Sequence, residues 1–381
     1  MRAVILAGGP GKGLARVSGG LPKTLLSIAG KAVIEYVLDA VIEAGIRDIT
    51  LVTDKPSYFA YLKEKYSRVL SITVKEQVGK EVAGAVLSAK EELSKGAILI
   101  YGDTLVPSTA INSLVDAFYS YGCPVLMVVP EMDVRLYGAV KVNRRNFITE
   151  FIEKPSKHLE GYYAFGGISI LNKEIVDLIE EEEALDKAIR NYLSKGGKLI
   201  ASIWSGWWVD VGYPWDILEA IYYILNMRKA SLISSSAKIA STAVIEGPVI
   251  IDEGAEVDHY AIIKGPAYIG KEVFVGANTF IRPYTSIERN SVISSYAEVT
   301  WSYIGESVTI GRGSFLGYSV VGREAVIEPQ VFTKLLVESE GIGIKVIKEY
   351  KRRREYHKIG SFISAKARVK SLTILKPGTY I

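Results

Sequence analysis

Two hydrophobic patterns divide the chain, and one gives way to the other near Arg228. Before this point, short apolar runs alternate with stretches in which apolar residues recur at helical spacing. The runs predict buried strands, at Val4–Leu6, Ile49–Thr53, Ile72–Val74, Ile98–Tyr101 and Val125–Val129. Because strands alternating with helices form βαβ units, we predict an α/β domain over residues 1–228. Its sheet is expected to be doubly wound and mixed, but mainly parallel, with helices on both faces.

The second pattern repeats every six residues. Aliphatic residues occupy every sixth position from Ile233 to Val299. A small or β-branched residue follows each of them after four positions, until Tyr303 ends the run. A helix cannot keep this register, and a β-sandwich would need an alternation of period two that is absent. The repeat therefore predicts a left-handed parallel β-helix over residues 229–381, with the aliphatic side chains pointing to its axis.

The repeat is interrupted once near its end. It runs to Ile327, stops, and resumes at Ile363. The intervening residues include the basic run KEYKRRREYHK, so we predict an arm inserted at about residues 333–360 that projects from the β-helix. We interpret its charges as a solvent-exposed face, with a phosphate-binding site as the alternative.

Composition narrows the class of protein. A net charge of +4 is too small for a dedicated nucleic-acid-binding protein, but it is compatible with anionic small substrates. No stretch approaches the ~20 apolar residues of a membrane span, so we expect no membrane association. Cys123 is the only cysteine, which excludes an intrachain disulfide and predicts a cytoplasmic protein. Abundant Lys and Glu with few Cys and Met resemble the composition of thermophile proteins.

Three charged residues, Lys23, Asp103 and Asp210, lie in motifs that are suited to bind phosphates or a metal ion. The strand VILAGG opens into a glycine-rich loop that leads to Lys23, and such loops let backbone amides approach phosphate oxygens. Asp103 ends the apolar run ILIYGD, and Asp210 lies in WWVDVG before a predicted helix. Each aspartate alone could simply cap a loop. Together, at the carboxyl edge of a sheet, they are suited to hold one Mg²⁺.

Two further motifs lie between these aspartates, YGAV at 137–140 and FIEKP at 151–155. With Lys23 and Asp103, they resemble the motifs of the sugar-1-phosphate nucleotidylyltransferase family, over the whole N-terminal domain. With its hexapeptide tail, the entire chain is similar to the subgroup that carries a C-terminal left-handed β-helix. That subgroup includes bifunctional archaeal and bacterial enzymes with an additional N-acetyltransferase activity.

The resemblance implies a reaction and a set of site residues. A nucleotidyl group would pass from a nucleoside triphosphate to a sugar 1-phosphate, with release of pyrophosphate. Asp103 and Asp210 would bind Mg²⁺, and the catalytic residues would be Lys23 at the triphosphate and Lys154 at the sugar phosphate. The implied nucleotide contacts are Gly8, Gly9, Gly11, Lys12 and Gln77, and the implied sugar-phosphate contacts are Gly138, Glu153 and Lys154.

Three positions of this site depart from the family pattern. The loop arginine that would hold the pyrophosphate falls on Gly13, with Lys12 or Arg16 as candidate substitutes. The Gly-Thr expected after Gln77 falls near Glu81, and the asparagine that contacts the sugar falls at Phe165. We therefore predict reduced or altered activity. The alternative is a non-catalytic regulatory or scaffolding subunit that pairs with an active paralogue.

The β-helix departs from its subgroup as well. The histidine that acts as a base in the acetyltransferases falls on Thr300, which cannot take a proton near neutral pH. His158, His259 and His357 lie elsewhere and form no metal-ligand cluster in the sequence. We therefore expect no acetyltransferase activity. Because left-handed β-helices associate about a threefold axis, we expect a homo-oligomer, a trimer.

Overall fold

The computed structural model describes residues 1–9, 11–79, 81–131, 133–335, 345–349, 352–356 and 358–381. The chain forms two compact units. The α/β unit comprises Met1–Gly9 and Ile34–Asp210, and the β-helix unit comprises Pro10–Val33 and Val211–Ile381. The segment 10–33 thus groups with the C-terminal residues. The division into domains 1–228 and 229–381 stays a prediction about which parts fold independently.

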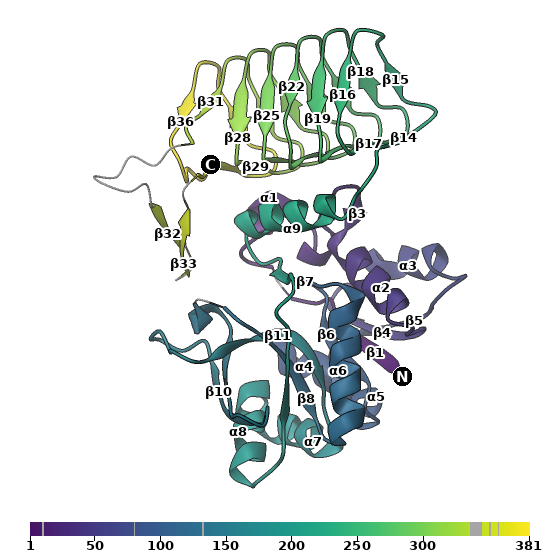
Figure 1. Ribbon diagram of the computed structural model, residues 1–381, viewed down its shortest axis with the longest axis vertical. Coiled ribbons are helices and arrows are strands. Elements are labelled where there is room, and N and C mark those ends of the chain that lie inside the picture. Colours follow the sequence, from purple (N-terminus) through teal and green to yellow (C-terminus); the bar gives the residue numbers. More distant parts are fainter. Residues whose placement is uncertain (10, 80, 132, 336–344, 350–351, 357) are drawn as a thin grey trace. The chain divides into compact units, whose positions relative to one another are not determined.

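A nine-stranded mixed sheet forms the centre of the α/β unit (Figure 1). Its path runs β10 (Ile148–Glu153), β9 (Gly138–Val142), β11 (Tyr163–Ile170), β6 (Ile98–Tyr101), β1 (Arg2–Leu6), β4 (Asp48–Thr53) and β5 (Ser71–Glu76), while β8 (Val125–Val129) pairs with β11 and β12 (Ile200–Ile203). The strands β6, β1, β4 and β5 are parallel, whereas β11 is antiparallel to β6, β8 and β9. All five predicted strands and the mixed sheet are confirmed.

Helices cover this sheet. They are α2 (Val33–Glu43), α3 (Ala60–Lys65), α4 (Glu81–Leu87), α5 (Lys90–Ser94), α6 (Ser108–Tyr121), α7 (Lys173–Glu182) and α8 (Leu185–Ser194). Val4 of β1 packs in a core with Val86 of α4 and Ile179 of α7. Its neighbours Ala3 and Ile5, which point to the opposite face, are also fully buried. Both faces of the central strands are therefore covered, which explains why these strands read as continuous apolar runs.

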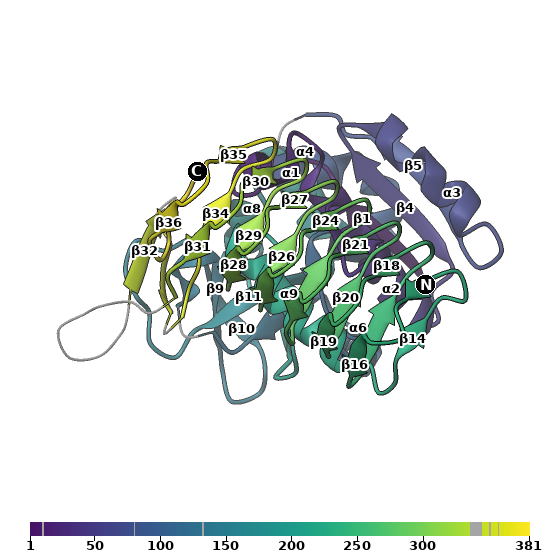
Figure 2. The same cartoon turned by 90° about the horizontal axis from the view of Figure 1, so that it is seen from above.

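The β-helix consists of three seven-stranded parallel sheets, and each coil supplies one strand to each sheet (Figure 2). Sheet 1 contains β14 (Leu232–Ile233), β17 (Val249–Ile251), β20 (Ala267–Ile269), β23 (Thr285–Ile287), β26 (Tyr303–Ile304), β29 (Val320–Val321) and β34 (Phe362–Ile363). Sheet 2 contains β15 (Lys238–Ile239), β18 (Glu256–Val257), β21 (Phe274–Val275), β24 (Val292–Ile293), β27 (Thr309–Ile310), β30 (Val326–Ile327) and β35 (Arg368–Val369). Sheet 3 contains β16 (Val244–Glu246), β19 (Ile262–Lys264), β22 (Phe280–Ile281), β25 (Glu298–Thr300), β28 (Phe315–Gly317), β31 (Phe332–Thr333) and β36 (Ile374–Leu375). The predicted left-handed β-helix is confirmed.

The aliphatic residues of the repeat fill the axis of the β-helix. Ile263, Ile287 and Ile304 are fully buried, and each buried side chain of this size contributes about 1.5–3 kcal/mol. The first coil differs, because β14 lies at the edge of sheet 1 in the described part of the chain, and Ile233 is 44% exposed. The period of six therefore identifies the buried axial residues correctly in the interior coils, but less well in the first coil.

The interruption of the repeat lies between consecutive coils, because Val321 of β29 pairs directly with Ile363 of β34. Within the insertion, β32 (Lys345–Glu349) and β33 (Arg352–Tyr356) pair antiparallel. Residues 336–344, 350–351 and 357 of the predicted arm at 333–360, including His357, lie outside the described residues.

The segment 11–33 adds further elements to the β-helix unit. They are α1 (Ala15–Ser18), the 3₁₀-helix η1 (Lys23–Leu25) and the hairpin of β2 (Ser27–Ile28) and β3 (Lys31–Ala32). The helix α9 (Pro214–Asn226) follows the α/β unit in the sequence and packs on β26 and β29 of sheet 1. Among the described residues, no helix combines the length and the apolar character needed to cross a membrane.

Candidate functional site

The two predicted magnesium ligands lie on one small ribbon of the α/β unit. Its strands, β7 (Thr104–Leu105) and β13 (Val209–Asp210), run antiparallel, and Asp210 pairs with Thr104. Asp103 immediately precedes Thr104 and is only 8% exposed. Residues more than a hundred positions apart in the chain are therefore brought onto adjacent backbones.

A third carboxylate joins them around Tyr101. Burial raises the pKa of the Tyr101 phenol, and the charges of Glu153, Asp103 and Asp210 raise it further. In the described part of the chain, no three His, Cys, Asp or Glu side chains form a complete metal cage. Mg²⁺ does not need one, since it commonly uses one or two carboxylates together with substrate phosphates and water. The pair Asp103 and Asp210 fits this donor set.

The predicted sugar-phosphate residues meet at the end of β10. Gly138 pairs with Glu153 across β9 and β10, and the amide of Lys154 donates to the carbonyl of Tyr137 at 3.0 Å. A Cβ on Gly138 would lie 2.5 Å from the Phe151 ring, so no larger residue fits there. The Lys154 ammonium is 3.4 Å from a Glu153 oxygen and largely exposed, which leaves it accessible to a phosphate.

Trp208 is a residue of this region that sequence reasoning missed. Its indole N–H donates to the carbonyl of Gly166 at 3.0 Å, and its ring meets that of Tyr137 edge to face, with centroids 5.1 Å apart. Gly167 has φ +76°, and a Cβ there would lie 2.5 Å from Thr104 Oγ1. Trp208 thus connects the carboxylate ribbon with the sugar-phosphate residues. The only signal in the sequence is its place in WWVD beside Asp210.

Phe165, which replaces the expected asparagine, is part of the core. It is 8% exposed and packs edge to face against both Tyr101 and Phe151, at centroid distances of 5.8 and 6.1 Å. An aromatic ring is therefore favoured here for packing. A polar contact to a sugar hydroxyl would have to come from another residue.

The predicted nucleotide residues of the α/β unit also lie together. A Cβ on Gly8 would be 2.4 Å from Gln77 Oε1 and 3.2 Å from the amide nitrogen of Asp54. Gln77 Nε2 donates to the carbonyl of Glu81 at 3.0 Å, which orients the side-chain amide. Gly9 has φ +112°, and a Cβ there would meet none of the described atoms within 4 Å. Gly8 and Gly9 thus present bare backbone beside Gln77.

Glu81, at the position of the expected glycine, adopts φ +56°. This left-handed conformation is one that glycine takes at little cost and other residues rarely adopt. The backbone at Glu81 therefore has a form that suits glycine, although the side chain present is larger and carries a negative charge.

The remaining predicted residues belong to the β-helix unit. A Cβ on Gly11 would lie 3.2 Å from Cβ of Lys23, so the loop passes close to the lysine stem, while Lys12 is exposed. At Gly13 a Cβ would lie 2.2 Å from the carbonyl oxygen of Gly212 and 3.0 Å from the Tyr213 ring. The close approach of another backbone explains why the expected arginine is absent at this position.

Comparisons with known proteins agree with this arrangement. The family model described as nucleotidyl transferase matches residues 2–227. The chain belongs to the nucleotidyl transferase family. A bifunctional protein GlmU of Methanocaldococcus jannaschii is 32% identical over 100% of this chain and 92% of its own length. A bifunctional sugar-1-phosphate nucleotidylyltransferase/acetyltransferase of Sulfurisphaera tokodaii is 28% identical over 100% of this chain and 94% of its own length.

Solved structures support the fold of this family member. A UDP-glucose pyrophosphorylase of Acinetobacter baumannii aligns with a TM-score of 0.51 and 23% identity, over 59% of this chain and 93% of the other. A protein of Bacillus anthracis assigned as a glucose-1-phosphate thymidylyltransferase aligns with a TM-score of 0.52, over 58% and 94%. The resemblance to sugar-1-phosphate nucleotidylyltransferases with a C-terminal β-helix is therefore confirmed over the full chain.

At the position of the β-helix where the resemblance predicts a histidine base, this family member has Thr300. Thr300 is 6% exposed, and its carbonyl accepts a hydrogen bond from Ser302 Oγ at 2.8 Å. The next residue, Trp301, has φ +46° and stacks on Tyr318, with centroids 5.4 Å apart. His259 lies elsewhere, with Nδ1 2.8 Å from Thr242 Oγ1. This coil is thus packed with aromatic side chains and carries no base at Thr300.

Proposed function

We propose that this protein transfers a nucleotidyl group from a nucleoside triphosphate to a sugar 1-phosphate. A phosphate oxygen of the sugar 1-phosphate forms a bond to the α-phosphorus, the bond from that phosphorus to the bridging oxygen breaks, and pyrophosphate leaves. The observation that carries the proposal is that Asp210 pairs with Thr104, the residue after Asp103, and that the charges of both aspartates and of Glu153 act on Tyr101. The family and the full-length relatives support it.

Charge neutralisation and positioning supply most of the catalysis in such a transfer. Asp103 and Asp210 are the residues that would hold Mg²⁺, which when bound offsets the negative charge of the phosphates. Lys23 and Lys12 are assigned to the triphosphate, and Lys154 to the sugar phosphate. Gly8, Gly9 and Gly11 are assigned to the nucleotide, and at Gly9 a Cβ would meet none of the described atoms within 4 Å, which leaves room for a phosphate or ribose oxygen. Gln77 offers its oriented amide to the base.

The departures at Gly13, Glu81 and Phe165 support a lower or altered activity. A loop arginine offers a bidentate fork to pyrophosphate, and neither Gly13 nor a nearby lysine replaces it. The same observation favours a second candidate, a regulatory or scaffolding subunit of an active paralogue, because such a subunit needs to bind nucleotide or partner but not to release pyrophosphate.

Calorimetry with each nucleoside triphosphate and Mg²⁺ tests the proposal directly. We expect wild type to bind at least one triphosphate, and the double variant Asp103→Asn, Asp210→Asn to bind it at least about tenfold more weakly, a loss of about 1.4 kcal/mol, since the metal would lose both charged ligands. Glu131→Gln, which changes a carboxylate outside the proposed site, is the matched control. Wild type should then release pyrophosphate with one of a panel of sugar 1-phosphates. Binding without any release would favour the regulatory subunit, and no binding would contradict the catalytic proposal.

A further inference from the structure

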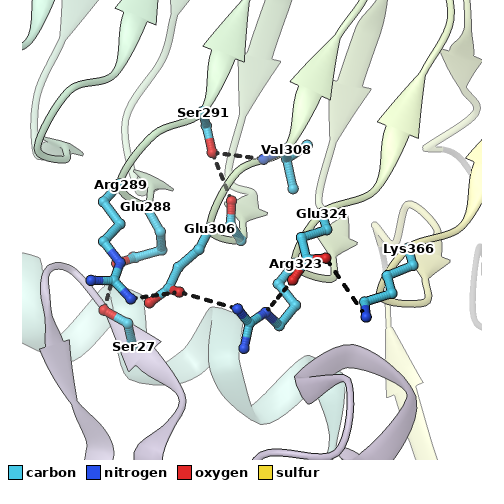
Figure 3. A network of polar contacts seen from close by, with 10 residues as sticks. Ser27, Glu288, Arg289, Ser291, Glu306, Val308, Arg323, Glu324 and Lys366 are labelled. Carbon is cyan, nitrogen blue, oxygen red and sulfur yellow. Dashed lines mark hydrogen bonds and ion pairs between the residues drawn. The ribbon is translucent and has the colours of Figure 1, made fainter.

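One carboxylate of the β-helix unit binds the segment 11–33 although it lies far away in the sequence. Glu288 follows β23 of sheet 1 and is only 1% exposed. Its Oε1 accepts from the amide of Ala29 at 2.9 Å and from Ser286 Oγ at 2.6 Å. Its Oε2 accepts from Ser27 Oγ at 2.7 Å and from the amide of Gly30 at 3.2 Å. Figure 3 shows Ser27 reaching Glu288 from the hairpin of β2 and β3.

Two of these four donors are successive amides of the hairpin turn, and the shape of the turn aims both at Glu288. Ala29 has φ +47° and Gly30 has φ +82°, and this left-handed backbone turns two successive amides toward one acceptor. A buried carboxylate is costly unless hydrogen bonds compensate for the lost water, and here burial raises the pKa of Glu288. The uncommon backbone of Ala29 and the burial of Glu288 therefore depend on each other.

A second set of contacts holds the beginning of the same segment. The amide of Ala365, which follows β34, donates to the carbonyl of Arg16 at 2.7 Å, and the Arg16 guanidinium lies 4.9 Å from the centre of the Tyr380 ring. A Cβ on Gly19 would be 3.1 Å from Ala365 Cβ and 3.3 Å from Arg323 Cδ. Arg323 pairs in turn with Glu324 at 3.1 Å, as Figure 3 shows. Both ends of the segment are thus held by coils of sheet 1.

A short hydrogen-bonded path leads from Glu288 to Lys23. The hairpin is closed by the amide of Val33, which donates to the carbonyl of Leu26 at 3.0 Å. The amide of Leu26 donates in turn to the carbonyl of Lys23 at 3.2 Å, at the end of η1. Lys23 lies only four residues before Ser27, so the segment that connects the lysine to the bound hairpin is short.

We propose that Glu288 is a positioning residue for the nucleotide, holding the hairpin 27–32 on the β-helix so that Lys12 and Lys23 keep a fixed place. The inference rests on the proposed function, because it assigns the triphosphate to these lysines. It gives the β-helix a role in the transferase reaction that is independent of acetyl transfer.

Three variants test this role. Glu288→Ala removes all four hydrogen bonds, and Glu288→Gln keeps the shape of the side chain and the acceptor for Ala29 but puts an NH₂ group against the Gly30 amide. The matched control is Glu328→Ala. Glu328 also joins successive coils, through Arg368 and Ser371, but it takes no part in the contacts to the segment 11–33 described above.

Hydrogen exchange and nucleotide binding are measured on the full-length protein. We expect Glu288→Ala to lose protection at the amides of Ala29 and Gly30 and to raise the Kd for Mg²⁺–nucleoside triphosphate about tenfold, a typical coupling between sites. Glu288→Gln should fall between this variant and wild type, and Glu328→Ala should match wild type in both measurements. A rise in the nucleotide KM with little change in the sugar 1-phosphate KM would separate positioning from general loss of structure.

The outcomes distinguish this inference from the proposed function. If wild type binds nucleotide and Glu288→Ala binds it equally tightly, or if the exchange at Ala29 and Gly30 is unchanged, the positioning role is overturned alone. If Glu328→Ala weakens binding as much as Glu288→Ala, the effect is not specific to the hairpin and the role is again overturned. If wild type binds no nucleotide, the proposed function fails and this inference fails with it.

Discussion

At the scale of single residues, one close contact leaves no space for a side chain at each of three glycines. Gly138 is confined by the Phe151 ring, Gly8 by Gln77, and Gly13 by the carbonyl of Gly212. At each of these glycines an added Cβ would lie closer to its neighbour than van der Waals contact allows. A close-packed interior tolerates little added volume. The absence of the loop arginine at Gly13 is therefore coupled to the backbone at Gly212, so it cannot be treated as an isolated substitution.

This coupling leads to a prediction for Gly13. Replacing Gly13 with Ala should destabilise the protein by about 1–3 kcal/mol, because the new Cβ would overlap the Gly212 carbonyl and the backbone would have to move. Gly13→Arg should be at least as destabilising and should not raise the rate of pyrophosphate release. Urea unfolding and a pyrophosphate assay measure both effects.

Gly20→Ala is the control for this prediction. At Gly20 a Cβ would meet none of the described atoms within 4 Å, so only the cost of its left-handed backbone, with φ +91°, remains. A Gly13→Arg protein as stable as wild type and more active would show that the loop accepts the family arginine after all.

At the scale of elements, the coil that contains β25 has a clear structural role around Thr300. Val299 continues the aliphatic register of the axis and is fully buried. Thr300, the next residue, pairs with Gly317 of the following coil in sheet 3. Trp301 then stacks on Tyr318 and lies 4.2 Å from the Tyr284 ring, which belongs to the preceding coil. Aromatic packing along the coils thus preserves the element without a base.

We accordingly predict that the protein does not transfer acetyl groups. With acetyl-CoA and a panel of amino-sugar phosphates, its release of free thiol should be at least about 100-fold slower than that of the Sulfurisphaera tokodaii relative, because a general base typically contributes 10²–10⁴-fold. The relative, which is named as an acetyltransferase, is the positive control. Thiol release at a comparable rate would mean that a residue other than Thr300 takes the proton.

At the scale of the whole molecule, one surface of the β-helix suggests how copies of the chain associate. Outward-facing residues of sheet 3 stack in a single row through the strand register, and all but one of them are apolar. The row consists of Val244, Ile262, Phe280, Glu298, Phe315, Phe332 and Ile374. Phe332 is 45% and Ile374 62% exposed. Contiguous apolar surface of this kind marks association sites in soluble proteins.

The predicted trimer should therefore depend on this row. Phe332→Glu with Ile374→Glu should shift the protein from a trimer to monomers, since charges buried at an interface without partners are strongly unfavourable. Sedimentation equilibrium gives the mass of each species. Val292→Glu, on sheet 2 and 37% exposed, is the matched control and should leave the trimer intact. A wild type that sediments as a monomer, or a double variant that stays trimeric, would contradict the prediction.

The sequence by itself determined the fold class and most of the elements. The five predicted strands of the α/β sheet are present, and the period of six identified the axis of the β-helix, because burial imposes its period on the apolar residues wherever a core is continuous. The motifs around Asp103, Lys154 and Asp210 were sufficient to indicate the family. The roles of the individual site residues and the Mg²⁺ remain predictions.

Only the tertiary structure decided which of these residues are neighbours. It brought Asp103 and Asp210 to one ribbon, buried Phe165 in the core, and grouped the segment 11–33 with the β-helix through Glu288. Glu288 has no distinctive signal in the repeat, where it reads as an ordinary polar residue after Ile287. Contacts between residues more than 250 positions apart leave no periodic pattern in either partner, since periodicity records the face that a residue occupies and not what covers that face.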